Sequence, residues 1–267
     1  MVLVLLLGGG LGWLIYRAKV QRDAVAVVIR SGGSVVYDWQ YGPVEGFAPP
    51  SQPNAPRWLV DWLGPDYFGK VFRARFGKNP IPGGDLAAIE RLTGLRELDL
   101  SSTTLADADL AHLRGLVEIK ALYLGDTAIS GAGLIHLGGL KNLQILHLAR
   151  TRVADLGPLA GRLGKLIWLD LSGTPVTDSG LAPLLQSTNL SFLLLQDVGI
   201  TDAGLAHLRR APKIDSLLLD GTAITDKGID DLPKFVRLTS ISLTRTKVSP
   251  ERIAKLRQEY LNTAVNY

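Results

Sequence analysis

The stretch that decides the fold is LIWLDLSGTPVTDSGLAPLLQSTNL, residues 166–190. It begins with three spaced leucines (Leu166, Leu169 and Leu171), continues through Thr177-Asp178 and Gly180-Leu181, and starts again at Leu190. A unit that recurs at a fixed period is one turn of a solenoid rather than a domain. The period therefore has to be established before any single helix or strand.

The unit occurs seven times. Its first apolar position falls at Leu95, Ile119, Leu143, Leu166, Leu190, Ile214 and Leu238, with spacings of 24, 24, 23, 24, 24 and 24 residues. A second column has the same spacings and consists of Thr103, Thr127, Thr151, Thr174, Val198, Thr222 and Thr246. The short step comes after Asp155, where the segment has lost one residue. This regularity predicts stacked copies of a single structural unit.

The pattern resembles the leucine-rich repeat, in which L-x-x-L-x-L forms a strand and the rest of the unit returns as a helix. Threonine stands here where asparagine or cysteine is usual. The T-D-x-G-L segment at 177–181 and 201–205 is most similar to bacterial repeat proteins of planctomycete type, and it is also similar to the repeats of F-box adaptors. The resemblance covers about residues 71–260. It implies an α/β solenoid, or horseshoe, with parallel strands on the concave face and helices on the convex face.

The residues of one unit support the same architecture without the family. Apolar and polar residues alternate over 169–171, which indicates a strand, whereas Leu181 and Leu184 have helical spacing. The Thr-Asp pair before Gly-Leu is a helix N-cap signal, so we interpret these pairs as structural. Neighbouring helices need about 8–10 Å and neighbouring strands about 4.8 Å, so the stack should curve with its strands inside.

The threonine column predicts a hydrogen-bonded ladder. We expect each hydroxyl to lie in the turn after a strand and to bond the backbone of an adjacent turn, as asparagine does in related repeats. Val198 lacks the hydroxyl, so the hydrogen-bonding groups around it should have other partners.

Composition excludes several classes of function. The chain has no cysteine, so a thiolate catalyst or a cysteine-ligated metal is impossible. The net charge of +4 is spread along the repeats without a basic stripe, and we expect no nucleic-acid partner. Three of the four histidines share one column on neighbouring helices, too far apart to chelate one metal ion. Without a phosphate loop or a catalytic triad, we expect neither an enzyme nor a cofactor.

The N-terminal run 2–16, VLVLLLGGGLGWLIY, carries no charge and spans about 22 Å as a helix, against about 30 Å for a bilayer core. This run is compatible with three interpretations: a cleaved signal peptide, a buried core helix or a membrane anchor. Trp13 and Tyr16 suit a membrane interface, so we expect a membrane-anchoring helix over residues 1–19 and a single-pass membrane localisation. The side on which the repeats lie stays open.

Four segments follow from this organisation. After the anchor, residues 20–70 form an N-terminal cap made of a helix to about residue 31, a strand over 34–39, a proline-rich loop over 42–57 and a short helix over 58–63. Residues 71–248 hold one degenerate and seven regular repeats. Residues 249–267 form a C-terminal cap whose helix starts at Ser249-Pro250-Glu251, with Ile253, Leu256 and Tyr260 on its inner face.

The residues between the strand leucines should face the concave side, where solenoids usually bind. Apolar and aromatic residues gather there in the middle repeats. The candidate partner-binding residues are Tyr123, Ile145, His147, Trp168, Asp170, Phe192, Leu194 and Leu218. They predict a non-catalytic, membrane-anchored module, monomeric itself, that binds a protein. The alternatives are a substrate-recognition adaptor of a ubiquitin-ligase-like complex and a scaffold without a specific ligand, in which Trp168 and Phe192 only cover the sheet.

Overall fold

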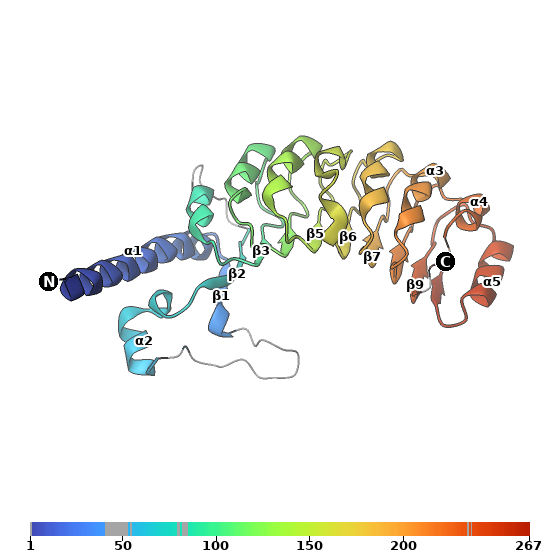
Figure 1. Ribbon diagram of the computed structural model, residues 1–267. Helices are drawn as coiled ribbons and strands as arrows, with labels where there is room; N and C mark the ends of the chain where they lie inside the picture. The colour runs from blue at the N-terminus through green and yellow to red at the C-terminus, as the bar shows by residue number, and fades with distance from the viewer. Residues whose placement is uncertain are drawn as a thin grey trace.

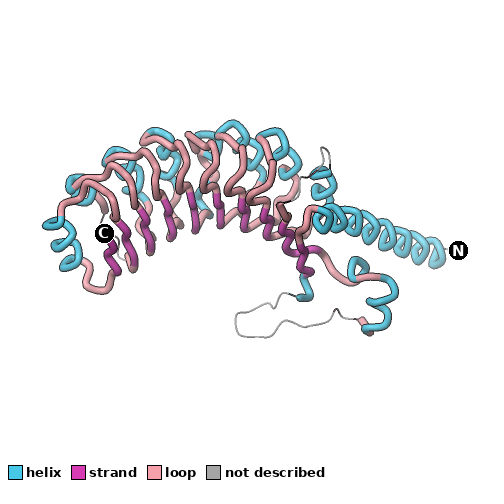
Figure 2. The backbone as a smooth tube through the Cα atoms, turned by 180° about the vertical axis from the view of Figure 1, so that it is seen from behind, coloured by secondary structure: helices cyan, strands magenta, loops and turns pink. Residues whose placement is uncertain are grey.

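The computed structural model describes residues 2–40, 53, 55–78, 81, 85–233, 235 and 237–267. Ten strands of this part of the chain form one continuous sheet in the order β1 to β10. The first pair is antiparallel and every later pair is parallel. The strands line the inner side of an arc and the helical turns its outer side (Figures 1 and 2). The predicted α/β solenoid is confirmed.

The elements follow the repeat period. The strands are β1 (Ser34–Tyr37), β2 (Val71–Arg75), β3 (Glu97–Asp99), β4 (Ala121–Tyr123), β5 (Ile145–His147), β6 (Trp168–Asp170), β7 (Phe192–Leu194), β8 (Ser216–Leu218), β9 (Ser240–Ser242) and β10 (Ala264–Asn266). The α-helices are α1 (Val2–Arg30), α2 (Arg57–Leu63), α3 (Asp202–Leu205), α4 (Asp226–Asp230) and α5 (Pro250–Glu259). The 3-10 helices are Asp38–Gln40, Pro65–Tyr67, Asp85–Arg91, Asp107–Leu113, Gly131–Gly139, Gly157–Leu159, Leu163–Lys165, Ser179–Gln186 and Ala206–Arg210.

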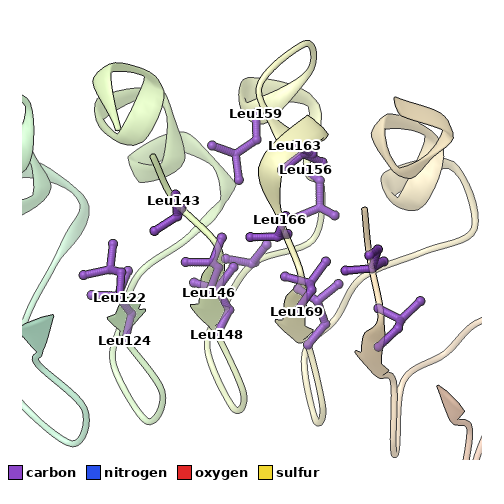
Figure 3. Packing of buried hydrophobic residues seen from close by; sticks show 14 of the residues in the cluster. Leu122, Leu124, Leu143, Leu146, Leu148, Leu156, Leu159, Leu163, Leu166 and Leu169 are labelled. Carbon is purple, nitrogen blue, oxygen red and sulfur yellow. The ribbon is translucent and has the colours of Figure 1, made fainter. Parts of the chain in front are cut away.

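Each strand of the seven regular repeats, β3 to β9, is three residues long and has a leucine or isoleucine at its centre. Leu146 pairs with Leu122 on one side and Leu169 on the other, so the repeat spacing becomes the register of the sheet. These leucines are fully buried and form the continuous core between the sheet and the outer turns (Figure 3). Burying one leucine side chain is worth about 1.5–3 kcal/mol, and the core repeats this contribution in every unit.

The outer layer differs from the expected row of helices. Most of its elements are 3-10 helices, and the α-helical pieces α3 and α4 have only four and five residues. A 24-residue period must hold a strand, two turns and the return, which leaves little length for regular α-helix. The shortened repeat after Asp155 shows this most clearly, since two three-residue 3-10 helices replace one longer element there.

The threonine column makes a different hydrogen bond from the one predicted. Each hydroxyl donates to the carbonyl oxygen three residues earlier in its own turn, as Thr174 does to Leu171 at 2.6 Å. The same bond recurs from Thr103, Thr127, Thr151, Thr222 and Thr246 at 2.6–2.7 Å. The expected bond to an adjacent turn is wrong, and the column closes individual turns rather than linking repeats.

Replacing Val198 by threonine should therefore stabilise the protein. Val198 is buried at a position where six other repeats carry the bonded hydroxyl, and a new bond to the Leu195 carbonyl should add about 0.5–1.5 kcal/mol. The reverse change, Thr174→Val, should remove a similar amount. Urea unfolding of both variants measures this. A lower midpoint for Val198→Thr would show that this turn is closed in some other way.

Aspartates provide the link between repeats. The aspartate of one repeat accepts both the backbone N–H and the side-chain hydroxyl of the Thr or Ser in the next repeat, at 2.6–2.8 Å. The pairs are Asp107 with Ser130, Asp178 with Thr201, Asp202 with Thr225, and Asp226 with Ser249. The bonds from Ser249 also lower the pKa of Asp226. The predicted cap role is confirmed for Thr201, whose hydroxyl accepts the N–H of Ala203.

The N-terminal helix corrects the membrane prediction. It is one helix of 29 residues, and charged residues such as Arg17, Lys19 and Arg22 stand in its middle. In the described part of the chain, no helix combines the length and the apolar character needed to cross a membrane. The membrane-anchoring helix over residues 1–19 and the single-pass localisation are therefore wrong. Instead, the second half of α1 packs on the solenoid, where Ala24 and Val28 are buried in the core.

A buried aspartate fastens α1 to the first strands. Asp66 accepts hydrogen bonds from the Gln21 side chain and from the Tyr37 hydroxyl, both at 3.0 Å. Burial and the charge of Asp66 raise the pKa of Tyr37, which keeps its hydroxyl protonated as the donor. Gln21 also accepts the N–H of Val71 at 3.3 Å. One polar cluster thus joins α1, β1 and β2.

The rest of the N-terminal segment matches the expectation in part. The helix ends at Arg30 before Gly32, whose φ of 80° suits glycine. The predicted strand over 34–39 stops at Tyr37, and it runs antiparallel to β2, so it is not the start of a further repeat. Most of the proline-rich loop predicted over 42–57 lies outside the described residues.

The C-terminal cap has its predicted helix and an additional strand. Ser249 caps α5 by accepting the N–H of Arg252 at 3.1 Å, and Ile253 and Leu256 are buried against the last repeat. After the helix, β10 pairs parallel with β9 and covers the edge of the sheet. The strand of the last repeat, β9, therefore has a hydrogen-bonded neighbour on both sides.

Candidate functional site: the concave face

All eight predicted site residues lie on one continuous surface, which we call the concave patch. They are Tyr123 on β4, Ile145 and His147 on β5, Trp168 and Asp170 on β6, Phe192 and Leu194 on β7, and Leu218 on β8. The register places Ile145, Trp168 and Phe192 in one row and Asp170, Leu194 and Leu218 in the next. The two rows lie next to each other on the same face of the sheet, because residues two apart along a strand point to the same face.

An aromatic pair occupies the middle of the patch. The rings of Trp168 and Phe192 stack with centroids 4.9 Å apart and an angle of 25° between their planes. Both side chains are half-buried, because each ring covers part of the other and of the sheet. Such a pair contributes about 0.5–1.5 kcal/mol beyond the area it buries, so the surface it presents is preorganised.

A polar group borders the aromatic pair on the side of β4 and β5. The imidazole of His147 lies beside the ring of Tyr123, with centroids 6.3 Å apart, and its Nε2 is 3.1 Å from Oδ2 of Asp170. The ring also covers Gly125, where a side chain would collide with it. Glycine at this position is therefore required for the histidine to lie against the sheet.

Asp170 lies within the patch, between His147 and Leu194 in the same row of the sheet. Only 7% of the residue is exposed. Burial raises the pKa of Asp170, but the hydrogen bonds from His147 and from the Ser172 amide outweigh it, so the net pKa is lowered. The carboxylate therefore stays charged and orients His147. Although the residue lies where the sequence predicted, its side chain has its partners within the protein.

Charged and hydrogen-bonded residues bound the patch at both ends. On the N-terminal side, Arg75 pairs with Asp99 at 3.3 Å. On the C-terminal side, Asp220 accepts hydrogen bonds from Ser242 at 2.5 Å and from Gln196 at 3.0 Å. Burial raises the pKa of Asp220, but the hydrogen bonds have the larger effect, so its net pKa is lowered. The apolar surface is thus limited to the middle strands.

The rim of the concave face, which is the row of residues at the turns that follow the strands, was not predicted from the sequence. One residue per repeat has a left-handed backbone with φ between 53° and 70°: Ser102, Asp126, Arg150, Gly173, Asp197, Gly221 and Arg245. Its N–H extends the strand ladder by one further bond, as from Asp126 to Ala149. The side chains pair along the rim, Arg150 with Asp126 and Arg245 with Asp197. The two glycines in this column were the signal in the sequence that could have predicted its left-handed backbone.

A second apolar surface lies on the N-terminal cap. Trp58 and Trp62 of α2 are 68% and 76% exposed, more than any side chain of the concave patch. The sequence predicted a short apolar helix there and did not predict this exposure. The two residues are four apart, so they lie on one side of the helix.

The arrangement of the concave patch suits binding. Its centre is aromatic and aliphatic, and its one histidine is held by a buried carboxylate. Apolar surface with aromatic residues at its centre is typical of protein-binding sites.

Comparison with known proteins gives the fold. No protein-family model matches the chain, and no curated protein matches its sequence. Many solved structures do match, and two of them are from Listeria monocytogenes. Internalin C2 aligns with 73% of this chain and 80% of its own, at 25% identity and a TM-score of 0.59. The internalin inlF aligns with 73% of this chain at 19% identity and a TM-score of 0.56, and the match spans only 60% of that protein. The chain therefore has an internalin-like leucine-rich-repeat fold.

Proposed function

We propose that the chain is a non-catalytic leucine-rich-repeat module that binds a protein partner through the concave patch. The stacked pair of Trp168 and Phe192 carries the proposal. Both are half-buried with apolar neighbours in the same rows and polar residues beyond. A partner that covers the two rings would remove their remaining apolar surface from water, at about 25 cal/mol per Å².

The fold supports this proposal. The internalin-like fold is a solenoid, and solenoids usually bind through the inner side of the arc. The finer resemblance to planctomycete-type repeats and to F-box adaptors remains a prediction from the T-D-x-G-L motif. The adaptor function finds no separate support in the described structure, and we do not propose it.

Truncating Trp168 should weaken partner binding by about 2 kcal/mol or more, as expected for a central aromatic hot spot. The experiment is affinity capture with the full chain and with Trp168→Ala, followed by binding titrations of any protein that is lost. The sheet should tolerate the change, because the same column holds Ala121 and Ser216 in other repeats.

Ser216→Ala is the matched control, since it alters the same column beside the aromatic pair and should keep the partner. A partner retained equally by all three chains would place the binding site elsewhere, and the exposed tryptophans of α2 would be tested next. Absence of any partner from every sample would contradict the binding function and favour a scaffold.

A further inference from the structure

The apolar residues of the concave patch form an oblique band across four strands. Ile145 on β5, Trp168 on β6 and Phe192 on β7 share one row, and the band then passes to the next row with Leu194 on β7 and Leu218 on β8. All five residues are partly exposed. With about 4.8 Å between strands and about 6.7 Å between residues two apart on a strand, the band is about 16 Å long.

The sheet beneath the band limits which backbone structure a partner can have. Each of β5, β6, β7 and β8 pairs with a strand on both sides, so its N–H and C=O groups are directed within the sheet. An extended peptide on this face would lose water from its own backbone groups without gaining new partners for them, which is unfavourable. An α-helix bonds its backbone internally, so the face favours a helix.

The spacing of the band favours the same structure. Three steps from strand to strand cover the band, which gives about 5.3 Å for each step along it. One turn of an α-helix rises by about 5.4 Å, so successive turns stay in register with successive strands. The side chains on one face of an extended peptide recur only every 6.7 Å or about that distance, and they would lose register with the strands at every step.

The two ends of the band differ in charge. Lys120 lies at the Ile145 end, where its carbonyl oxygen accepts the N–H of Ile145 at 2.9 Å, and the residue is exposed. Asp220 lies two residues beyond Leu218 at the other end, and its hydrogen bonds keep it ionised. The ion pairs along the rim add no net charge. Because a helix is positive at its N-terminus and negative at its C-terminus, a helix on the band should have its N-terminus toward β8.

We propose that the concave patch binds an amphipathic α-helix of the partner protein, with its N-terminus toward Asp220 and its C-terminus toward Lys120. The inference rests on the proposed function, since it names the structure of the partner at the same site. About three turns of the helix lie along the band, and apolar residues at i, i+4, i+7 and i+11 contact one strand each. The stacked rings of Trp168 and Phe192 contact the two central ones.

Selection from a phage-displayed library of random peptides of about 16 residues, long enough for four turns, tests the helix with the full chain as target. The enriched peptides carry the i, i+4, i+7, i+11 pattern, and circular dichroism of a synthetic one shows helix gained on addition of the chain. Enrichment of alternating apolar residues would overturn the helix and leave the proposed function intact. No enrichment, or equally tight binding to Trp168→Ala, would also overturn it, and the affinity capture described above decides separately whether the patch binds a protein.

Variants on one strand test the course of the band. Leu218→Ala lies within the band and weakens binding of the selected peptide about fivefold or more. Ser216→Ala, on the same strand but outside the band, leaves the affinity unchanged. Thermal unfolding checks that each variant is folded, and Leu218→Ala keeps the test valid if Trp168→Ala unfolds. Equal effects of Leu218→Ala and Ser216→Ala would overturn the oblique course.

Introduced cysteines test the direction of the helix, because the chain has none of its own. Thr244 marks the β8 end, since its N–H donates to Asp220 at 2.9 Å, and Lys120 marks the other end. A selected peptide with an N-terminal cysteine forms a disulfide faster with Thr244→Cys than with Lys120→Cys, and a C-terminal cysteine reverses this preference. Equal or opposite preferences would overturn the proposed direction.

Discussion

Leu169→Ala is expected to lower the free energy of unfolding by about 2–5 kcal/mol. Leu169 is fully buried and pairs with Leu146 and Leu193 in the central column of the sheet. Truncation leaves a cavity between two repeats, and the packed leucines around it can collapse only in part (Figure 3). Urea denaturation followed by circular dichroism measures the loss.

The neighbouring variant Trp168→Ala provides the contrast. Trp168 points to the opposite face of the same strand and is half-buried, so its truncation should destabilise the fold less than the truncation of Leu169. The stacking with Phe192 makes this cost larger than zero. A greater loss of stability for Trp168→Ala than for Leu169→Ala would mean that the aromatic pair serves mainly to hold the solenoid together.

The repeat period was sufficient to predict the sheet and the content of the concave face. Parallel strands one period apart must pair, so the 24-residue spacing already places Trp168 beside Phe192. The alternation of side chains along a strand then assigns Leu169 to the core. Both predictions depend only on spacing, and both are confirmed.

Side-chain hydrogen bonds could not be predicted in the same way. Asparagine carries two N–H donors on a longer side chain, whereas the single short hydroxyl of Thr174 reaches only the carbonyl of Leu171 in its own turn. The analogy with asparagine therefore failed. Likewise, no pattern showed that Asp170 is held by His147, because that contact depends on the room above Gly125.

The helix to about residue 31 was predicted correctly, but the role of its first part was misjudged for a physical reason. The uncharged run 2–16 suggested a membrane anchor, whereas the helix ends at Arg30 and its second half packs on the solenoid. The partners of the second half, Gln21 with Asp66 and Val28 with the core, are distant in sequence. Hydropathy alone cannot reveal contacts of this kind.

The glycine of the T-D-x-G-L motif is explained by the aspartate of the preceding repeat. A side-chain carbon at Gly204 would lie 2.5 Å from Oδ1 of Asp178, an oxygen that already accepts the N–H of Thr201 at 2.8 Å. The same contact recurs between Gly228 and Asp202. The motif therefore encodes an interaction between repeats: each aspartate bonds the next Thr and requires glycine beside it.

Gly204→Ala should lower the free energy of unfolding by about 2–4 kcal/mol, because the added carbon displaces the Asp178 carboxylate and weakens both of its bonds to Thr201. In an Asp178→Ala background the obstacle is absent, so the same change should cost less by about 1 kcal/mol or more. Gly199→Ala is the control in the same repeat, since nothing lies within 4 Å of the added carbon and stability should be kept. The four free energies of the cycle are measured by urea denaturation. Equal costs of Gly204→Ala with and without Asp178 would show that the glycine is required for its backbone alone, and that the aspartate ladder does not set the motif.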